Sequence, residues 1–442
     1  MMKLITRIGL AVVFALVGFG CAASQSGRSV NVTDVQEFEI DGVKVLLKQS
    51  TESPVVSAFL YIRGGSSAMP ITKPLTVESF ALNVNAASGT RSTSKALYRQ
   101  KMLRMGSGIG GQDSRDYSLM LMRSTREHFD TTWKFFAEKI TSPVFDPIEF
   151  ANLKKNALLN IQAVTANPAG YSRYLLDSIY YSGHPYGRRT SAADIERTTI
   201  ASMEQHMKEI MVKSRLALVV VGPVSREEIT RKLREGGVTS LPEGNYVTPP
   251  LAPSANSAKP NVVIVRSPRK LPTNYVIGYF KIPARGSADY YPYMRMRYFL
   301  GSNLFNRIRV EHALAYAPSL DESEWADPVG VITFETAHVD SAINLVYEDV
   351  EFFQNYILRQ SAISGNVDRL ATSIFMEQET SQSQAEAIGE AFIMTGDWRN
   401  AFMSPEKLAA VTSQELNQAA KTYLRNFNWL VLGDSVTISQ LR

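Results

Sequence analysis

The stretch Leu300-Gly-Ser-Asn-Leu-Phe-Asn-Arg-Ile-Arg-Val-Glu-His-Ala-Leu-Ala-Tyr316 carries the most information about the fold. Arg309 and Tyr316 lie seven residues apart, which on a continuous helix is two turns, so both would share one face. If the helix instead ends near His312, Tyr316 begins the next strand and can fold back toward Arg309. A guanidinium and a phenol that converge on a cleft can donate hydrogen bonds to peptide carbonyls. Spacing alone also allows an Arg at a helix end beside a half-buried Tyr.

The residues around this pair resemble the C-terminal half of the pitrilysin/insulinase-type metallopeptidases (inverzincins), close to their mitochondrial-processing-peptidase branch. The run "LGSNLFNRIR" followed by "ALAY" is similar to the family pattern L-G-x-x-x-x-S-R-L-x-x-x-L-R-E-x-x-G-L-A-Y, whose Arg and Tyr hold the substrate backbone. The resemblance therefore assigns substrate binding to Arg309 and Tyr316. The match is incomplete, because Ala313 stands where the family usually has Gly and Val310 where it has Glu.

The first twenty residues, 1–20, are typical of an export signal. Lys3 and Arg7 form a basic start, and the apolar run from Ile8 to Val17 is too short to span a bilayer. Without Lys3 and Arg7 the formal net charge falls from +5 to +3, which does not indicate a nucleic-acid partner.

Cys21, the only cysteine, follows this segment directly. A lone cysteine cannot form an internal disulfide, and its position resembles a bacterial lipidation site; simple secretory cleavage is the alternative. The residue after Cys21 is Ala22 and not Asp, which resembles the pattern of lipoproteins that are sorted to the outer membrane. We therefore expect residues 21–32 to be a tether that holds the protein by lipid chains in the bacterial cell envelope, facing the periplasm.

The rest of the chain repeats one plan twice. The helical face Trp133, Phe136, Ala137 and Ile140 recurs 210 residues later, and the strand end Val219-Val-Val-Gly222 recurs at an offset of 211. Strands and helices mix without strict alternation, which predicts α+β domains, each an antiparallel-rich sheet with helices on one face. We place an N-terminal domain at 33–240, a linker at 241–260 and a C-terminal domain at 261–442. The resembling family has the same duplicated plan.

Active members of that family carry His-x-x-Glu-His on their first long helix and a further Glu downstream, which bind zinc and activate water. Counting back from Ser88-Gly89-Thr90, the vacant ligand and base positions fall on Phe80, Asn83, Val84 and, downstream, Asn160. Phe and Val cannot ligate zinc and Asn cannot take a proton from water, so we expect no metal and no cofactor on this chain.

The five histidines offer no replacement site. Only His206-Met-Lys-Glu209 has an H-x-x-E fragment, and an ordinary surface or helix-face histidine is the simpler interpretation. His184 stands in "HPYG", which matches a structural turn of the family. The remaining histidines show no ligand spacing and are His128, His312 and His338.

The glycine-rich run from Gly106 to Gly111 lacks the Lys-Ser/Thr of a phosphate-binding loop and precedes a strand. It resembles the family's edge strand, to which substrate adds as an extra strand. We therefore name Ile109, Gly110 and Gly111 as candidate substrate contacts; a plain hairpin arm is the alternative.

These observations predict a non-catalytic subunit that binds peptide through Arg309 and Tyr316. A separate His-x-x-Glu-His chain of the same family would supply zinc and the general base. The alternative is a structural envelope lipoprotein that kept the fold and has no proteolytic role. A third hypothesis is an active hydrolase with an unrecognised site.

Overall fold

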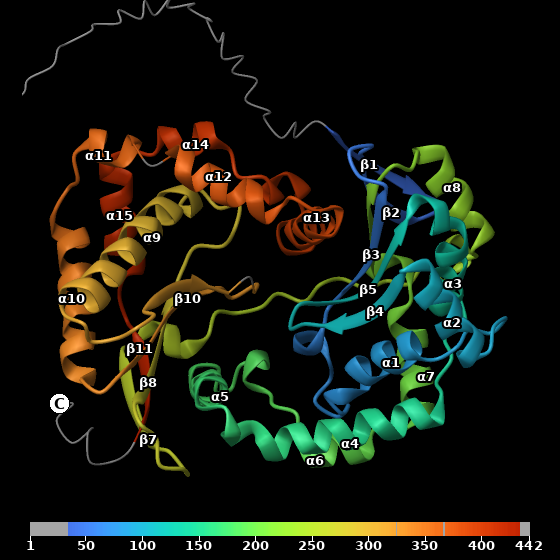
Figure 1. Ribbon diagram of the computed structural model, residues 1–442, viewed down its shortest axis with the longest axis horizontal. Coiled ribbons are helices and arrows are strands. Elements are labelled where there is room, and N and C mark those ends of the chain that lie inside the picture. Colours follow the sequence, from blue (N-terminus) through green and yellow to red (C-terminus); the bar gives the residue numbers. More distant parts are fainter. Residues whose placement is uncertain (1–33, 324, 366, 434–442) are drawn as a thin grey trace, which may run out of the picture. The chain divides into compact units, whose positions relative to one another are not determined.

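The computed structural model describes residues 34–323, 325–365 and 367–433, and the predictions on the export signal, Cys21 and the tether fall outside these ranges. The described residues form one compact unit that contains two β-sheets. Figure 1 shows both sheets with their flanking helices. No helix within the described ranges is long and apolar enough to cross a bilayer.

The first sheet has six strands in the order β1-β2-β6-β3-β5-β4. All neighbours are antiparallel except β2 and β6, which are parallel. The strands are β1 (Val35–Ile40), β2 (Val43–Gln49), β3 (Val55–Arg63), β4 (Gly108–Asp113), β5 (Tyr117–Thr125) and β6 (Leu216–Gly222).

The second sheet repeats this plan with five strands in the order β7-β11-β8-β10-β9. Its one parallel pair, β7 and β11, corresponds to β2 and β6. The strands are β7 (Asn261–Arg266), β8 (Asn274–Lys281), β9 (Ser319–Glu322), β10 (Val329–Thr336) and β11 (Asn428–Gly433). Apart from β1, both sheets share one strand order, which confirms the predicted α+β class and the duplication.

The turn between β1 and β2 is fixed by its sequence. Asp41 and Gly42 both have positive φ, 48° and 86°, as a two-residue type I′ hairpin turn requires. The register that follows places Ile40 opposite Val43, so Asp41 and Gly42 form the two-residue turn of a β-hairpin.

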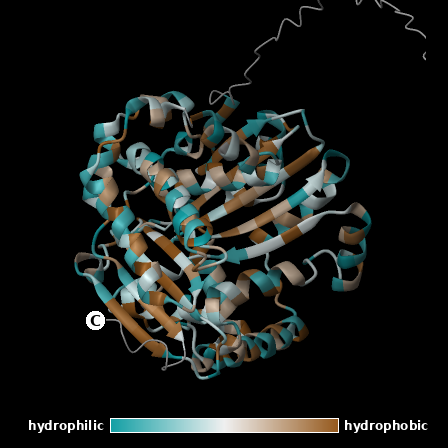
Figure 2. Ribbon diagram, turned by 60° about the vertical axis from the view of Figure 1, so that its left-hand side comes forward, coloured by the Kyte–Doolittle hydropathy of each residue, from teal (hydrophilic) through white to brown (hydrophobic). Residues whose placement is uncertain are grey.

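Fifteen α-helices complete the described fold. In Figure 2 most of them carry a hydrophobic and a hydrophilic stripe, whereas the inner strands are largely hydrophobic. In chain order the helices are α1 (Thr76–Ala87), α2 (Lys95–Met105), α3 (Phe129–Thr141), α4 (Pro147–Ala163), α5 (Pro168–Tyr180), α6 (Ala192–Arg197), α7 (Ile200–Ile210), α8 (Arg226–Glu235), α9 (Tyr290–Leu304), α10 (Val339–Asn355), α11 (Gln360–Ser364), α12 (Val367–Glu377), α13 (Ser381–Thr395), α14 (Pro405–Ala410) and α15 (Ser413–Tyr423).

One face of each sheet packs against helices from its own half of the chain. Helices α1, α3, α7 and α8 share a core with the first sheet, and α9, α10 and α15 share one with the second. The repeated helical face is buried in α3, as predicted. In α10 it is buried except at Tyr347, which is 40% exposed and whose hydroxyl lies 3.0 Å from the indole nitrogen of Trp429.

The other face of each sheet packs against a helix from the opposite half. Helix α13 packs on β3 and β6 of the first sheet, and α5 packs on β8 and β11 of the second. The Tyr61 hydroxyl of β3 donates to the main-chain oxygen of Glu386 in α13, at 3.0 Å. In the same way the Tyr279 hydroxyl of β8 donates to Asp177 in α5, at 2.8 Å. The two halves therefore exchange one helix each.

The predicted linker, 241–260, has no strand or α-helix, yet it is anchored by specific contacts. The amide of Ser254 donates to a carboxylate oxygen of Asp327 at 2.9 Å, and the side-chain amide of Asn256 donates to the carbonyl of Ile179 at 3.0 Å. Its composition predicts the lack of regular structure but not these contacts. The domain boundaries given above remain predictions.

Candidate functional site

Helix α1 carries the positions that hold zinc in the resembling family, and here they belong to the hydrophobic core. Phe80 and Val84 are 3% and 1% exposed. The Phe80 ring meets the ring of Phe150 on α4 edge to face, with centroids 6.2 Å apart. Two apolar side chains therefore fill the space where two imidazoles would be needed.

The remaining positions of that site also lack ligands. The side-chain amide of Asn83 donates to the main-chain oxygen of Ser79, one turn earlier, at 2.9 Å. Asn160 is exposed on α4. These residues do not fit a zinc ion, and no group of three or more His, Cys, Asp or Glu side chains within the described ranges could hold a metal.

Glu78 is the one carboxylate of α1, and it is buried beside a histidine that the sequence places far away. The His206 Nε2 atom, on α7, lies 2.8 Å from a Glu78 oxygen, and the Ser118 hydroxyl donates to the other oxygen. Burial opposes the charge on Glu78, but these hydrogen bonds outweigh it and lower the pKa of the carboxyl. His206 is therefore a helix-face residue, as predicted, and its partner was not foreseen.

The C-terminal end of α1 is held by a buried lysine that the sequence did not single out. Lys139 on α3 donates to the carbonyls of Asn85, Ser88 and Gly89 at 2.6, 2.9 and 3.2 Å. These are the main-chain oxygens that a helix end leaves without an internal partner. Burial lowers the pKa of Lys139 to about 7.

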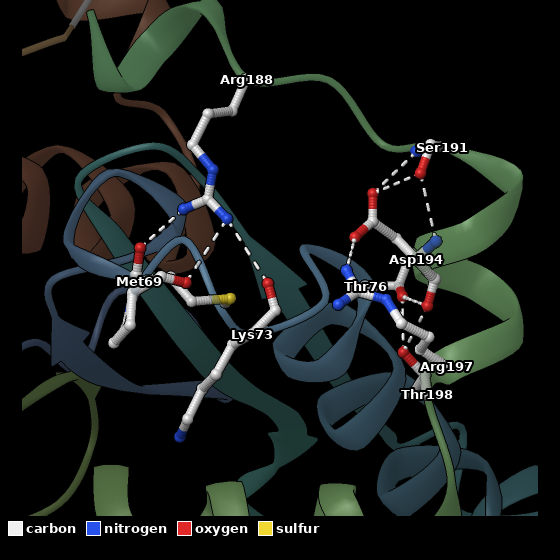
Figure 3. A network of polar contacts seen from close by, with 9 residues as sticks. Met69, Lys73, Thr76, Arg188, Ser191, Asp194, Arg197 and Thr198 are labelled. Carbon is white, nitrogen blue, oxygen red and sulfur yellow. Dashed lines mark hydrogen bonds and ion pairs between the residues drawn. The ribbon is translucent and has the colours of Figure 1, made fainter.

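The loop before α1 is fixed as well, as Figure 3 shows. Arg188, directly after the "HPYG" turn, donates to the carbonyls of Met69 and Lys73 at 2.6 and 3.4 Å. At the first residue of α1, the Thr76 hydroxyl donates to the carbonyl of Asp194 at 3.0 Å. Both ends of α1 are thus fixed although its metal ligands are absent.

The predicted edge strand is β4, which is last in the order of the first sheet and pairs with β5. Ile109 packs against the core. A Cβ atom added to Gly111 would lie 2.6 Å from that of Leu82 on α1, whereas at Gly110 the nearest atom would be 3.5 Å away. The lack of a side chain at Gly111 therefore lets α1 approach the sheet. A ligand at β4 would contact mainly the main-chain groups along the outer edge of this strand.

The structure brings Arg309 and Tyr316 together after a helix that ends at Glu311, as in the second predicted arrangement, but Tyr316 does not begin the next strand: β9 begins three residues later, at Ser319. An Arg309 Nη1 hydrogen donates to the main-chain oxygen of Tyr316, and the guanidinium lies 4.0 Å from the Tyr316 ring centroid. The Tyr316 side chain is 79% exposed rather than half-buried. This pair therefore presents a cation and a phenol at the surface.

A π-helix and a strained residue produce this arrangement. The π-helix spans Phe305–Glu311, and the amide of His312 donates to the carbonyl of Arg307 at 3.1 Å, five residues earlier. Ala313 then takes a positive φ of 51°, which reverses the chain and turns Tyr316 back toward Arg309. The glycine that the family usually has here would adopt this φ without strain.

A cavity of about 390 Å³ lies beside Tyr316. It is lined by residues of β8, β10 and the start of α5. Charged and aromatic side chains at its rim include Arg173, Tyr275, Tyr316 and Glu335. The site thus combines an exposed Arg/Tyr pair with a hollow large enough for part of a peptide.

Residues 197–364 match the family model described as "Peptidase M16 inactive domain". No curated protein sequence matches the chain significantly.

Several solved structures share the fold. The crystal structure of a peptidase M16 inactive domain from Pseudomonas fluorescens has a TM-score of 0.79 at 17% identity, covering 92% of this chain and 100% of that one. A protease from Helicobacter pylori has a TM-score of 0.77 at 14% identity, covering 90% and 99%. The periplasmic protease PqqL from Escherichia coli has a TM-score of 0.75 at 16% identity, covering 90% of this chain but 46% of PqqL.

Proposed function

Since residues 197–364 belong to the M16 inactive-domain family and the described chain has the fold of its solved members, we propose that this protein is a non-catalytic, peptide-binding subunit of a zinc peptidase. The resemblance to pitrilysin-type peptidases is thereby confirmed. The proposal rests on one combination: Arg309 and Tyr316 are joined at the surface beside a cavity, while Phe80 and Val84 fill the former metal site.

In this proposal the chain positions a peptide for cleavage by another chain. Arg309 keeps N–H groups beyond the one bonded to Tyr316, and a guanidinium can hold a peptide carbonyl through a charge-assisted hydrogen bond. The Tyr316 hydroxyl can donate to a second carbonyl. Fixing an extended peptide at two points raises the rate of a cleavage carried out elsewhere, because the reacting groups no longer have to be brought together.

The proposed partner is a catalytic chain of the same family that carries His-x-x-Glu-His and binds the zinc. PqqL supports this division, since the chain matches about half of that protease and PqqL has as much sequence again. In this proposal a second polypeptide supplies that further half.

The test is reconstitution. The purified chain should bind no stoichiometric zinc and cleave no peptide, and addition of the partner from the native membrane should restore zinc-dependent cleavage. Arg309→Ala combined with Tyr316→Phe should lower kcat/KM at least about tenfold, the effect of losing one charge-assisted hydrogen bond. Arg399→Ala is the control, because Arg399 is also an exposed arginine stacked on an aromatic ring, that of Trp398.

Two outcomes would defeat the proposal. One is full activity of the Arg309/Tyr316 double variant in the reconstituted complex. The other is the absence of any zinc peptidase among copurifying proteins, which would favour the structural lipoprotein instead.

We further propose that the protein is lipid-anchored at Cys21 in the bacterial cell envelope, facing the periplasm from the outer membrane. The support is the order of basic start, apolar run and cysteine in residues 1–21. Metabolic labelling with a fatty acid tests it: the wild-type chain should take up label, and Cys21→Ser should abolish uptake. Unlabelled wild-type protein would contradict the proposal.

A further inference from the structure

Helix α2 has an outward face with large apolar side chains. Its inner face is fixed by Tyr98 and Met102, and the Tyr98 ring meets that of Phe135 edge to face with centroids 5.3 Å apart. On the opposite face Leu103 is 84% exposed and Leu97 is 43% exposed. The two leucines are six positions apart, which places them about 120° apart around the helix axis, on either flank of the outward side of this 11-residue helix.

This helix and the loop before it are basic. The stretch from Ser88 to Gln112 contains five cations and no Asp or Glu; the cations are Arg91, Lys95, Arg99, Lys101 and Arg104. Lys95 and Arg99 are neutralised, since they form ion pairs with Asp146 and Glu149 at 2.9 and 2.9 Å. Within the described ranges Arg91, Lys101 and Arg104 have no carboxylate at ion-pair distance, and all three are exposed. The Lys101 ammonium also lies 5.9 Å from the centroid of the Phe135 ring, at the edge of the buried cluster.

We propose that the surface formed by Leu97, Lys101, Leu103 and Arg104 of α2, together with Arg91 in the loop before it, binds the surface of a bilayer that contains anionic lipids. Leucines bordered by Lys and Arg are the pattern of a helix that lies in a membrane interface, with its apolar side chains among the acyl chains and its cations at the headgroups. The inference goes beyond peptide binding and does not depend on lipidation of Cys21.

An acidic protein is a different kind of partner, and the residues favour the bilayer over it. A polyanion would need the cations but would gain little from Leu103, which projects almost fully into solvent. A bilayer uses both kinds of side chain, and it requires no further shape from the protein. The role of Leu103 therefore separates the two partners.

Vesicle sedimentation tests the proposal with residues 32–442, which form one compact unit without Cys21. Vesicles of phosphatidylethanolamine and phosphatidylglycerol should pellet the protein, vesicles of phosphatidylcholine alone should not, and 0.5 M salt should release most of it. Leu103→Glu should lower the bound fraction at least fivefold. Lys101→Glu with Arg104→Glu should do the same.

Met376→Glu on α12 is the matched control, because Met376 is also a large exposed apolar side chain, 69% exposed and on a different helix. It should bind like the unmodified protein. The near-ultraviolet circular dichroism of every variant should be unchanged, since the substituted side chains are exposed.

Three results would overturn the proposal. The first is no binding to anionic vesicles. The second is equal binding to phosphatidylcholine. The third is Leu103→Glu binding anionic vesicles as well as the unmodified chain while polyglutamate displaces both, which would identify a site for acidic polypeptides.

Discussion

At the residue scale, Ala313 shows that the Arg/Tyr pair is held by strained backbone. Its φ of 51° lies in the left-handed region, which costs an L-residue about 1 kcal/mol relative to Gly. Ala313→Gly should therefore raise the free energy of unfolding by about 0.5–1 kcal/mol in urea titrations. Ala315→Gly is the control and should lower it, because Ala315 is buried and has no positive φ. Equal effects of both substitutions would exclude strain at Ala313.

The buried pair of Glu78 and His206 should make stability depend on pH. The pKa of Glu78 in the folded protein is lowered from 4.5, so the unfolded chain binds the proton more readily. The contribution of this carboxylate is therefore complete above pH 4.5 and is lost as the pH falls through the folded-state value.

Replacement of Glu78 tests this pH dependence of stability. Glu78→Gln should lower the free energy of unfolding by about 1–2 kcal/mol at pH 7, and the difference from wild type should shrink steadily below pH 4.5. Glu204→Gln, on the exposed side of α7, should match wild type at every pH. A difference that stays constant from pH 7 to pH 3 would contradict a charged Glu78.

At the scale of elements, the packing of α1 on β4 depends on one glycine. Gly111→Ala would place a Cβ atom 2.6 Å from Leu82 Cβ and 2.8 Å from its backbone, so helix or strand must move. Overpacking of this kind costs about 1–3 kcal/mol. Gly110→Ala is the neighbouring control, with an ordinary contact of 3.5 Å, and should cost less than about 0.5 kcal/mol. Thermal unfolding of both variants tests this prediction. Equal midpoints would contradict the close approach of α1 to β4 at Gly111.

Local patterns were enough to predict most elements, because each depends on residues close in sequence. The hairpin at Asp41-Gly42 and helix α1 follow from turn chemistry and from helical spacing of apolar residues. Helices α5, α6, α8 and α11 to α14 were not predicted. For α5 the physical reason is that its apolar face packs on β8 and β11 of the second sheet, which lie about 100 and 260 residues later in the chain.

The sequence likewise predicts some features of the candidate site and leaves others undetermined. The sequence predicts which ligands are absent, since Phe80 and Val84 cannot bind zinc in any fold. It left two arrangements open for Arg309 and Tyr316, because the choice depends on the π-helix and on φ at Ala313. It could not reveal the contact of His206 with Glu78, which spans 128 residues.

At the scale of the whole molecule, the exchange of α5 and α13 ties the two halves into one folding unit. Tyr61 and Tyr279 occupy corresponding strands, and each donates its hydroxyl to the helix supplied by the other half. A Cβ atom on Gly389 of α13 would lie 2.0 Å from the Tyr61 ring. Neither sheet can therefore bury both of its faces with residues from its own half.

The predicted domains, residues 33–240 and 261–442, should consequently fail to fold when they are produced separately. Each would expose the apolar sheet face that the exchanged helix covers, and we expect both to bind a hydrophobic dye and to lack near-ultraviolet circular dichroism. Residues 32–442 should instead unfold in one transition, with tryptophan fluorescence and far-ultraviolet circular dichroism giving the same midpoint, since Trp133 and Trp429 lie in different halves. Separately folded fragments, each with a cooperative transition of its own, would show that the exchanged helices join two independent domains rather than completing a shared structure.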